Sequence, residues 1–550
     1  MIQQIKQQLK AEIKMALLAA GYPIEADFEA NLENTKDVSH GDFATNVAMQ
    51  LARVAKKNPR AVAEDIIAHL NNEEAHIDKA EIAGPGFINF SINKNALTQV
   101  INDIVTKGKD FGKSEANGVK YNVEYVSANP TGDLHLGHAR GAAIGDSVCR
   151  ILEAAGYDVV REYYVNDAGN QIHNLVLSVY ARYMEALGAT VEFPEDGYRG
   201  ADIEKFGREL ADKYQNKFED FDAVYSELRT LSIEFELDKI RKDLADFRVS
   251  FDLFVSEQSL YDNNFVEEAL VLLDEKGYIY EQDGAKWLRS TDFGDDKDRV
   301  LKKSDGSYTY LTPDIANHIE KVKRGFDQLV NLWGADHHGY IARVKAALQG
   351  LGHDANLLEV DIIQMVRLLK DGEEFKMSKR TGKAVTMREL VEDVGLDATR
   401  YFFASRSAES PMDFDLDLAV KQSNENPVYY VQYAHARACT LLARGRELGF
   451  VPASNDYYET LVHEKELDVI KLMGDFPAVV TDAAAKRKPH IVVNYLASLV
   501  ASFHSLYGAK KFIDDADPVG TKERLALVDA LRITIENALT LVGVSAPVSM

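Results

Sequence analysis

Two short motifs place histidines and lysines where they could act on a phosphate. His135-Leu-Gly-His138 carries two histidines three residues apart, and Lys376-Met-Ser-Lys-Arg-Thr-Gly382 carries three cations in five residues. Residues three apart share one face of a helix, so both imidazoles can donate hydrogen bonds to the same phosphoryl group. Lysines act as point charges that stabilise a departing pyrophosphate. The motifs therefore predict phosphoryl chemistry on a nucleotide, with His135, His138, Lys376 and Lys379 as the catalytic side chains.

The histidine motif lies where a strand is expected to meet a helix. Residues 121–127 have the composition of a strand, 129–133 are rich in turn residues, and a helix is predicted from there towards Gly156. A helix N-terminus presents unpaired N–H groups to an anion, and Gly137 lets a base or ribose approach the backbone. We therefore expect this turn to form a nucleotide site. Its predicted members are Ala128, Asn129, Pro130, Thr131, Gly132, Asp133, Leu134, His135, Leu136, Gly137 and His138.

Each motif alone leaves other readings open. A histidine pair can simply cap or pack a helix, and His-x-x-His can ligate zinc if a third ligand is near. No His-Glu-x-x-His pattern accompanies it, and Cys149 and Cys439 form no CxxC pair, so neither zinc nor a disulfide framework is predicted. A lysine cluster alone is most often a solvated turn. Thr386 and Glu389 form a predicted capping box that marks where a mobile lysine loop ends.

The order of the expected elements indicates how these motifs are positioned. Strand, turn, helix and strand follow one another over 121–165, and further strands are expected at 251–255, 329–333 and 361–369. A charged helical stretch, about 192–249, separates the two halves. The predicted fold class is α/β, with a Rossmann-type parallel-sheet catalytic domain at 106–420. An α+β domain is expected at 1–105 and an all-helical domain at 421–550.

Composition narrows the possible functions. The 550 residues include 87 acidic and 63 basic side chains, a net charge of −24 that opposes indiscriminate binding of polyanions, although a local basic face can still bind RNA. Such a length favours two to four domains. We find no apolar N-terminal run with a cleavage signal and recognise no later stretch of about 18 uncharged apolar residues. A cytoplasmic protein without a membrane segment is expected.

Together the two motifs resemble the signatures of class I aminoacyl-tRNA synthetases, which usually read His-Ile-Gly-His and Lys-Met-Ser-Lys-Ser. Leu136 and Arg380 depart from those forms and leave the reactive side chains unchanged. The surrounding sequences resemble arginyl-tRNA synthetases in particular. These are Glu124-Tyr-Val-Ser-Ala-Asn-Pro-Thr-Gly-Asp-Leu-His135, Tyr310-Leu-Thr-Pro-Asp314-Ile-Ala, Gly334-Ala-Asp-His-His-Gly-Tyr340, and segments 41–46, 83–87, 426–437 and 541–547. The resemblance covers nearly the whole chain.

This resemblance implies an arginine–tRNA ligase, which forms an arginyl-adenylate from ATP and L-arginine and then charges tRNA(Arg). It implies ATP contacts from Gly137, His135, His138, Ser378, Lys376 and Lys379, with Mg²⁺ on the phosphates and no protein side chain as a metal ligand. It also implies that Tyr310 and Asp314 meet the guanidinium, while Glu124 and Asn129 hold the α-amino and neighbouring groups. The guanidinium of arginine is a planar fork of N–H donors, and it needs acceptors of this kind. Asp336, where some relatives have glutamine, is a further arginine-binding candidate, and a structural hydrogen bond is the alternative role for each.

The helical domain offers candidates for binding RNA, namely Tyr429, Tyr430, Tyr433, Lys486, Arg487 and Lys488. At helical spacing the tyrosines can equally be core. Lys56, Lys57 and Arg60 are further candidates near the N-terminus. Two other functions stay open: a nucleotidyltransferase with the same sheet, which has no need of the helical domain, and a catalytically inactive tRNA-binding relative, which should have lost one motif. We expect a monomer whose activation of arginine requires bound tRNA.

Overall fold

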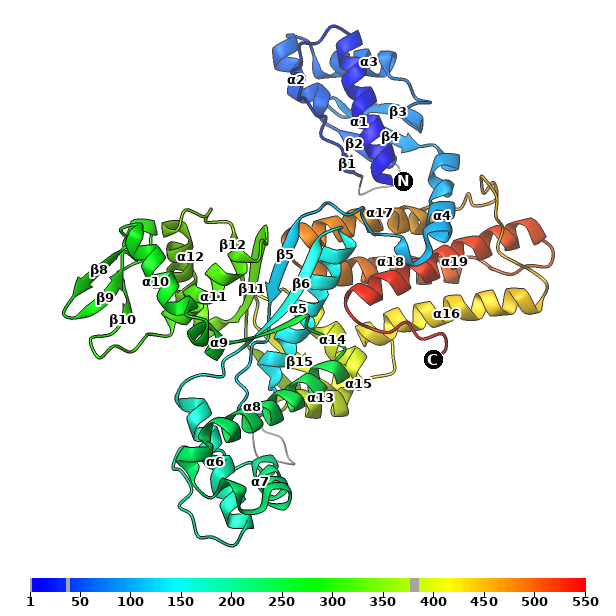
Figure 1. Ribbon diagram of the computed structural model, residues 1–550. Helices are drawn as coiled ribbons and strands as arrows, with labels where there is room; N and C mark the ends of the chain where they lie inside the picture. The colour runs from blue at the N-terminus through cyan, green and yellow to red at the C-terminus, as the bar shows by residue number, and fades with distance from the viewer. Residues whose placement is uncertain (1, 36–39, 376–384) are drawn as a thin grey trace.

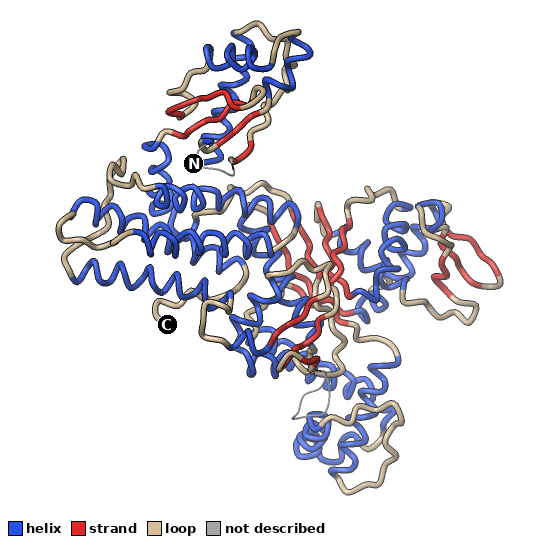
Figure 2. Tube along the Cα trace, turned by 180° about the vertical axis from the view of Figure 1, so that it is seen from behind, coloured by secondary structure: helices blue, strands red, loops and turns tan. Residues whose placement is uncertain are grey.

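The computed structural model describes residues 2–35, 40–375 and 385–550. At its centre is a five-stranded parallel sheet with strand order β12-β11-β5-β6-β7 (Figure 1). Its strands are β5 (Lys120–Glu124), β6 (Asp158–Val165), β7 (Leu253–Ser256), β11 (Gln328–Gly334) and β12 (Leu358–Ile363). Seen from behind, these strands lie between the long C-terminal helices and the smaller lobes of the molecule (Figure 2).

Strand order reverses in the middle of this sheet. β5 continues through helix α5 (Leu136–Ala154) to β6 on one side, whereas β11 continues through α12 (Ile341–Gly350) to β12 on the other. β5 and β11 are nevertheless parallel neighbours, so their carboxyl ends meet at one edge. Open α/β sheets bind ligands at such a switch point. The predicted α/β fold class is confirmed.

Two predicted strands end earlier than their apolar composition suggests. The predicted strand 361–369 is two strands, because the chain leaves the central sheet after Ile363 and starts β13 (Val366–Lys370) in a second sheet with β14 (Glu373–Glu374) and β15 (Met412–Asp415). At the break, the Gln364 carbonyl accepts a hydrogen bond from Arg140 at 2.8 Å. The predicted strand 121–127 stops at Glu124 because Val126 and Ser127 adopt left-handed φ values of 68° and 39°.

Two smaller lobes interrupt the parallel sheet. The first is helical and consists of α6 (Asn170–Ala186), α7 (Ala201–Tyr214) and α8 (Phe221–Asp246), which project away from the N-terminal domain (Figure 1). The second contains α9 (Glu257–Asp262), α10 (Phe265–Glu275) and α11 (Leu311–Lys323), and it carries the antiparallel strands β8 (Ile279–Gln282), β9 (Ala285–Leu288) and β10 (Arg299–Lys302). The sequence analysis did not predict this three-stranded sheet.

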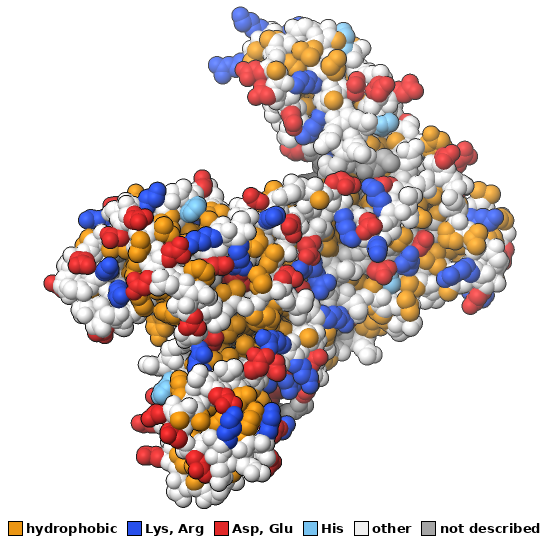
Figure 3. Space-filling model, viewed as in Figure 1, with side chains coloured by type: hydrophobic (Ala, Val, Ile, Leu, Met, Phe, Trp, Pro, Cys, Tyr) orange, Lys and Arg blue, Asp and Glu red, His pale blue; other side chains and the backbone are white. Residues whose placement is uncertain are grey.

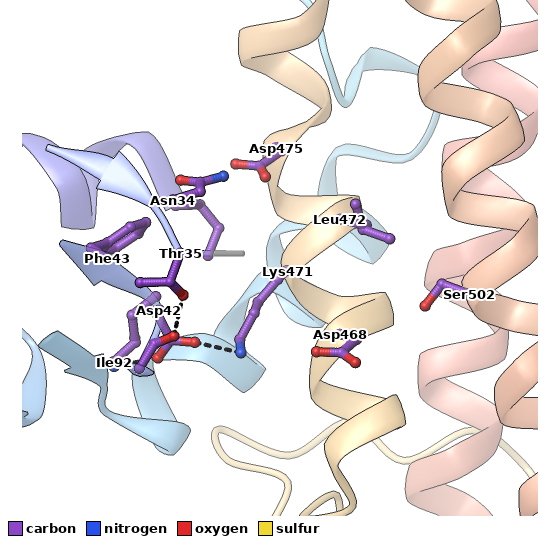
Figure 4. Close-up of a pocket in the computed structure, with 12 residues that line it drawn as sticks. Asn34, Thr35, Asp42, Phe43, Ile92, Asp468, Lys471, Leu472, Asp475 and Ser502 are labelled. Atoms are coloured by element: carbon purple, nitrogen blue, oxygen red, sulfur yellow. Dashed lines mark hydrogen bonds and ion pairs between the residues drawn. The ribbon is translucent and has the colours of Figure 1, made fainter. Parts of the chain in front are cut away.

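The N-terminal domain is α+β and stands at one end of the molecule (Figure 1). Its elements are α1 (Ile2–Ala19), β1 (Glu33–Asn34), β2 (Phe43–Thr45), α2 (Val47–Ala55), α3 (Pro59–His69), β3 (Ile77–Ala83) and β4 (Phe87–Ile92), followed by α4 (Lys94–Lys107). A cavity of about 360 Å³ separates this domain from helix α17 (Glu464–Lys486). Across it Lys471 forms an ion pair with Asp42, and Asp42 accepts a hydrogen bond from the Ile92 N–H (Figure 4). This ion pair and a second one, between Lys6 and Asp475, join the domain to α17.

The C-terminal domain is a helical bundle joined to the sheet by α13 (Met387–Val394), α14 (Leu396–Ala404) and α15 (Leu416–Val420). The bundle consists of α16 (Pro427–Glu447), α17, α18 (His490–Ala509) and α19 (Pro518–Leu541). The expectation that no long uncharged apolar stretch exists is wrong, because α18 is long and apolar enough to cross a membrane by length and composition. Its buried side chains, among them Val492, Leu496 and Phe503, pack into the bundle core. Buried core helices of soluble proteins also meet this criterion of length and composition.

One buried arginine ties the bundle to the histidine helix. The guanidinium of Arg400, on α14, is ion-paired with Asp146 of α5 and donates to the carbonyl oxygens of Phe247 at 2.9 Å and Val542 at 3.1 Å. Nearby, Asp397 accepts hydrogen bonds from Gln432 of α16 and from the Ser545 backbone N–H. Helix α5 is therefore packed between the sheet and the C-terminal residues.

Candidate functional site

A cleft of about 820 Å³ opens at the switch point between β5 and β11. Its walls come from the turn after β5, from the 3-10 helix η5 (Ala335–Tyr340) after β11, and from Gln364 and Met365 after β12. The predicted residues that line it are Ala128, Asn129, Thr131, Gly132, Asp133, His135, Gly137, His138 and Asp336. Pro130 and Leu134 are buried and Leu136 is half-buried; none of the three is among the cleft-lining residues.

The two histidines cap the helix they begin. His135 is the N-cap of α5, and its Nδ1 accepts a hydrogen bond from the Gly137 N–H at 3.0 Å. The His138 Nδ1 accepts from the His135 N–H at 3.3 Å, and the two rings stack with centroids 3.7 Å apart. Because each Nδ1 is an acceptor, each ring carries its proton on Nε2. Both side chains are thus held by the backbone and keep one N–H donor for a guest.

Both histidines are neutral at neutral pH. Burial lowers the pKa of His135, and burial together with the neighbouring His135 lowers the pKa of His138 to about 3. A neutral imidazole N–H can stabilise developing negative charge without first losing or gaining a proton. Among the described residues, no group of three or more His, Cys, Asp or Glu side chains is placed to hold a metal ion.

The turn after β5 is fixed by contacts from neighbouring strands. Ser127 donates through Oγ to Glu124 at 3.2 Å and accepts from the Tyr164 N–H at 3.1 Å. Asn129 donates through Nδ2 to the side-chain oxygen of Gln171, at 2.7 Å, in the first turn of α6. These bonds hold the left-handed backbone of the turn, a conformation that ordinary residues adopt at a cost of about 1–3 kcal/mol. Strain of this kind persists only where surrounding contacts over-determine it.

Behind the turn lies a cluster of charged side chains in which acids outnumber cations. Asp314, in the first turn of α11, makes no side-chain hydrogen bond or ion pair with the described part of the chain. Burial and the nearby carboxylates of Glu124 and Glu257 raise the pKa of Asp314 to about 8. Burial raises the pKa of the Tyr164, Tyr261 and Tyr340 hydroxyls, and the nearby acids raise it further. Such a cluster favours a cation with several N–H donors.

The other predicted arginine-binding residues are placed unequally around this cluster. Glu124, at the end of β5, is almost fully buried and ion-paired with Lys321. Tyr310, the N-cap of α11, is 78% exposed, and its charge contributes to the raised pKa of Tyr340, which lies near Asp314. Asp336 is exposed on the far wall of the cleft and lies 3.4 Å from His337. Asp336 is therefore not among the acids that surround Asp314.

Two polar residues at this edge were missed by the sequence analysis. Glu257 begins α9 directly after β7 and is 7% exposed, and Gln171 follows β6. A signal for both was present, because carboxyl ends of parallel strands meet at one edge and polar residues just beyond them face the ligand. The predicted strands at 158–165 and 251–255 would have pointed to them.

The lysine motif itself lies outside the described residues, and so do Lys376, Ser378 and Lys379. The chain on both sides of it is anchored. The Phe375 N–H donates to the Leu368 carbonyl at 2.8 Å, and Thr386 pairs with His135 in an antiparallel bridge. The predicted capping box of Thr386 and Glu389 is confirmed, with both reciprocal bonds present. Thr386, four residues after the motif, is therefore fixed beside His135.

The predicted RNA-binding tyrosines lie on α16, and two of them, Tyr430 and Tyr433, lie near His504 of α18. The rings of Tyr429 and Tyr433 are parallel within 7° with centroids 6.0 Å apart, and Tyr430 lies 4.6 Å from His504. The Arg437 guanidinium lies over the rings of Tyr433 and Tyr507, at 4.6 and 4.2 Å. All three predicted tyrosines are half-buried, so they pack against the bundle and keep a partly exposed ring edge or face.

The basic cluster at 486–488 is less available than its sequence suggests. Arg487 is ion-paired with Glu359 and Asp361 of β12, so it joins α17 to the central sheet and its guanidinium is occupied. Lys486 is paired with Asp482 one turn earlier, and Lys488 lies 3.9 Å from Glu409. An RNA contact of Arg487 would therefore have to compete with this largely buried ion pair.

Three family models together match almost the full length of the chain. "tRNA synthetases class I (R), catalytic domain" matches residues 99–414, "Arginyl tRNA synthetase N terminal domain" matches 3–92, and "DALR anticodon binding domain" matches 431–550. The chain belongs to the arginyl-tRNA synthetase family. Family membership and the predicted resemblance are thus confirmed.

Individual arginyl-tRNA synthetase relatives agree with these models. The arginine–tRNA ligase of Bacillus subtilis (strain 168) is 57% identical over 552 residues, which span 100% of this chain and 99% of that protein. A crystal structure described as a putative arginyl-tRNA synthetase from Campylobacter jejuni is 37% identical, with a TM-score of 0.76 over 83% of this chain and 100% of that chain. The Thermus thermophilus arginyl-tRNA synthetase shares the fold, with a TM-score of 0.74 at 23% identity over 99% of this chain.

Arginyl-tRNA synthetases act on RNA, yet this member carries a charge of −24. Acidic and basic side chains are interspersed over the face drawn in Figure 3. Mixed charge of this kind keeps non-specific attraction to a phosphate backbone low. Binding must then depend on specific contacts.

Proposed function

We propose that this chain is an arginine–tRNA ligase that forms arginyl-adenylate in the switch-point cleft and transfers arginine to tRNA(Arg). The proposal rests on two features of the structure that lie next to each other. A pocket of unbalanced carboxylates around Asp314 lies behind a turn that ends in two neutral imidazole N–H donors, His135 and His138. One end suits a guanidinium, and the other suits the phosphates of ATP.

In the first step a carboxylate oxygen of arginine attacks the α-phosphorus of ATP, and the bond to the departing pyrophosphate breaks. The Nε2–H groups of His135 and His138 donate to the phosphoryl oxygens as negative charge develops. Gly137 leaves room for the nucleotide, because a side chain at this position would lie only 3.0 Å from the His135 ring. Catalysis of this kind is positioning plus electrostatics, and it needs no protein nucleophile.

The arginine side chain occupies the acidic pocket. Asp314, Glu257 and Tyr310 meet the guanidinium, while Glu124 and Asn129 hold the α-amino group and its neighbours. Binding a guanidinium favours the ionised form of Asp314, because its positive charge opposes the burial and the neighbouring carboxylates that raise the pKa of Asp314. A pocket that needs all these acceptors filled rejects lysine and citrulline, because each leaves buried acceptors unpaired.

The lysine motif supplies the remaining charge for the phosphates. Lys376 and Lys379 act on the leaving pyrophosphate, and Ser378 contacts ATP. Mg²⁺ accompanies the phosphates and neutralises part of their charge. The bridge between Thr386, four residues after the motif, and His135 supports this role.

In the second step a ribose hydroxyl of the terminal adenosine, the 2′-hydroxyl in this class, attacks the arginyl carbonyl, and AMP leaves. Tyr429, Tyr430 and Tyr433, backed by Arg437, stack on unpaired anticodon bases, with Lys486 and Lys488 nearby on the same domain. Arginine activation requires the bound tRNA. The protein works as a monomer in the cytoplasm.

Pyrophosphate exchange across the amino acids, with and without tRNA, tests the proposal. We expect exchange with arginine and with no other amino acid, and only when tRNA is present. Efficient exchange with lysine or glutamate would overturn the assignment of the pocket. Deleting residues after 426 is a poor test of the tRNA requirement, because Arg400 and α5 would lose buried partners at Val542 and in α17 and α19. Point variants on α16 avoid this problem.

A further inference from the structure

A fully buried lysine lies beneath the proposed arginine pocket. Lys321 is on α11, two helical turns after Asp314, and its side chain is 0% exposed. Its ammonium is ion-paired with Glu124 of β5 and lies 3.2 Å from Glu162 of β6, whose side chain is also 0% exposed. A buried ammonium is tolerated only when opposite charges surround it. Lys321 has two.

Further bonds make this ion pair part of a rigid network. Glu162 accepts from Arg324 at 2.7 Å and from Asn122 at 2.9 Å. On the same face of α11, the His318 Nδ1–H donates to the Asp314 carbonyl at 2.7 Å, and its Nε2 accepts from Asn331 of β11 at 2.9 Å. Helix α11 is thus joined to three strands by polar contacts, and these contacts set where Asp314 lies relative to Glu124.

Lys321 also acts on the charge of the pocket. It is the cation whose field lowers the pKa of Asp314, against burial and the carboxylates of Glu124 and Glu257, which raise it. The titratable and charged groups around Lys321 and Asp314 are Glu124 of β5, Glu162 and Tyr164 of β6, Glu257 and Tyr261 of α9, His318, Glu320 and Arg324 of α11, and Tyr340 of η5. Acids outnumber cations in this set.

We infer that Lys321 is a positioning residue that serves as the internal counter-ion of the arginine pocket, holding Glu124 in place and offsetting part of the repulsion among the acids that receive a guanidinium. This inference rests on the proposed function of the pocket. Lys321 itself does not touch the substrate, because Glu124 lies between them. It balances part of the negative charge of the acids, and arginine supplies the remaining positive charge when it binds.

Lys321→Met removes the charge and keeps much of the volume. Arginine binding at neutral pH should weaken roughly tenfold or more, as expected if the pocket's carboxylates titrate about one unit higher. The loss should shrink as pH rises, whereas the affinity for ATP stays unchanged. Lys321→Arg, which keeps the charge, should return the pH profile towards that of the unaltered protein. Calorimetric titration with arginine and with ATP, at several pH values, measures these quantities without catalysis.

Lys323→Met is the matched control, because Lys323 lies two residues further on α11, pairs with Glu268 at the surface and is 43% exposed. It should leave both affinities unchanged. Glu162→Gln provides a test of opposite sign that does not depend on Lys321→Met folding. Removing this negative charge should shift the pH profile of arginine binding to lower pH.

The outcomes separate this inference from the proposed function. If the unaltered protein binds no arginine, either alone or with tRNA present, the proposed function fails. If it binds arginine and Lys321→Met leaves the pH profile unmoved, or Glu162→Gln shifts the profile to higher pH, the network is merely structural and the inference is overturned. Equal losses of arginine and ATP affinity would also overturn it.

Discussion

One end of the cleft must bind negatively charged phosphates and the other a positively charged side chain, and the two ends do so by different means. At the phosphate end, His135 and His138 are neutral and are held by backbone N–H groups. At the amino-acid end, Asp314 and its neighbours form a half-buried set of acids whose repulsion is only partly relieved by Lys321. A fixed neutral donor costs little to bury, whereas unbalanced charge is costly. The unbalanced acids therefore destabilise the empty pocket, and a bound cation relieves this repulsion. The pocket is selective for cations for that reason.

The largest effect should come from the amino-acid end. Asp314→Asn removes the charge and keeps the shape, so kcat/KM for arginine should fall by about 10⁴-fold, the scale on which a polar pocket rejects a substrate with a missing partner. The KM for ATP should stay within a small factor. Asp274→Asn, at an exposed carboxylate on α10, is the matched control and should change neither. Equal losses for arginine and ATP would erase the distinction between the two ends.

The next effect should come from the phosphate end. His135→Asn removes the Nε2–H donor but keeps a good helix N-cap. The single-turnover rate of adenylate formation should fall by about 10²–10³-fold, with arginine affinity and melting temperature unchanged. A large drop in melting temperature would mean that capping, rather than catalysis, is the main role of His135.

The two ends should also differ in their response to pH. The pKa of Asp314 is raised to about 8 in the empty pocket, so below that pH each arginine that binds must displace a proton. Arginine affinity should therefore rise with pH by up to about tenfold per unit until pH 8. His138, whose pKa is lowered to about 3, stays neutral over the same window, and burial lowers the pKa of His135 in the same direction. Binding of Mg–ATP should then stay nearly flat, and calorimetry at matched pH values compares the two ligands.

The same raised pKa affects stability. A carboxyl group whose pKa is higher in the folded protein than in the unfolded chain favours folding at low pH and loses that contribution as pH rises through its folded value. Without arginine, the melting temperature should therefore decline between about pH 5 and pH 8, and Asp314→Asn should flatten this decline. An unchanged slope in the variant would show that other groups cause it.

The smallest effect on either end should come from a remote change. Arg437→Ala removes the guanidinium between Tyr433 and Tyr507, and the dissociation constant for tRNA should rise roughly tenfold, the scale of one lost stacking contact. Arginine and ATP affinities measured without tRNA should not move. Arg444→Ala, at an exposed residue of the same helix paired with Glu447, is the control.

The sequence alone predicted the helix start at His135 and the capping box at Thr386, because both depend on residues three or fewer positions apart. It predicted most strands of the central sheet from their apolar runs. It could not place Lys321 against Glu124, since that pair joins residues 197 apart through the packing of α11. It also could not show that Arg487 is ion-paired with residues of β12, because the partners of an ion pair leave no local pattern in the sequence.

Arg400 has a consequence for how the protein is made. Its guanidinium joins Asp146 of the histidine helix, Phe247 and Val542, so its partners are spread over most of the polypeptide. A chain that emerges from the ribosome N-terminus first cannot complete this buried site until Val542 has been synthesised. The N-terminal domain can fold early, whereas helix α5 must wait with its polar Asp146 unpaired. During translation the catalytic domain is thus an open folding intermediate, and chaperones should bind it there.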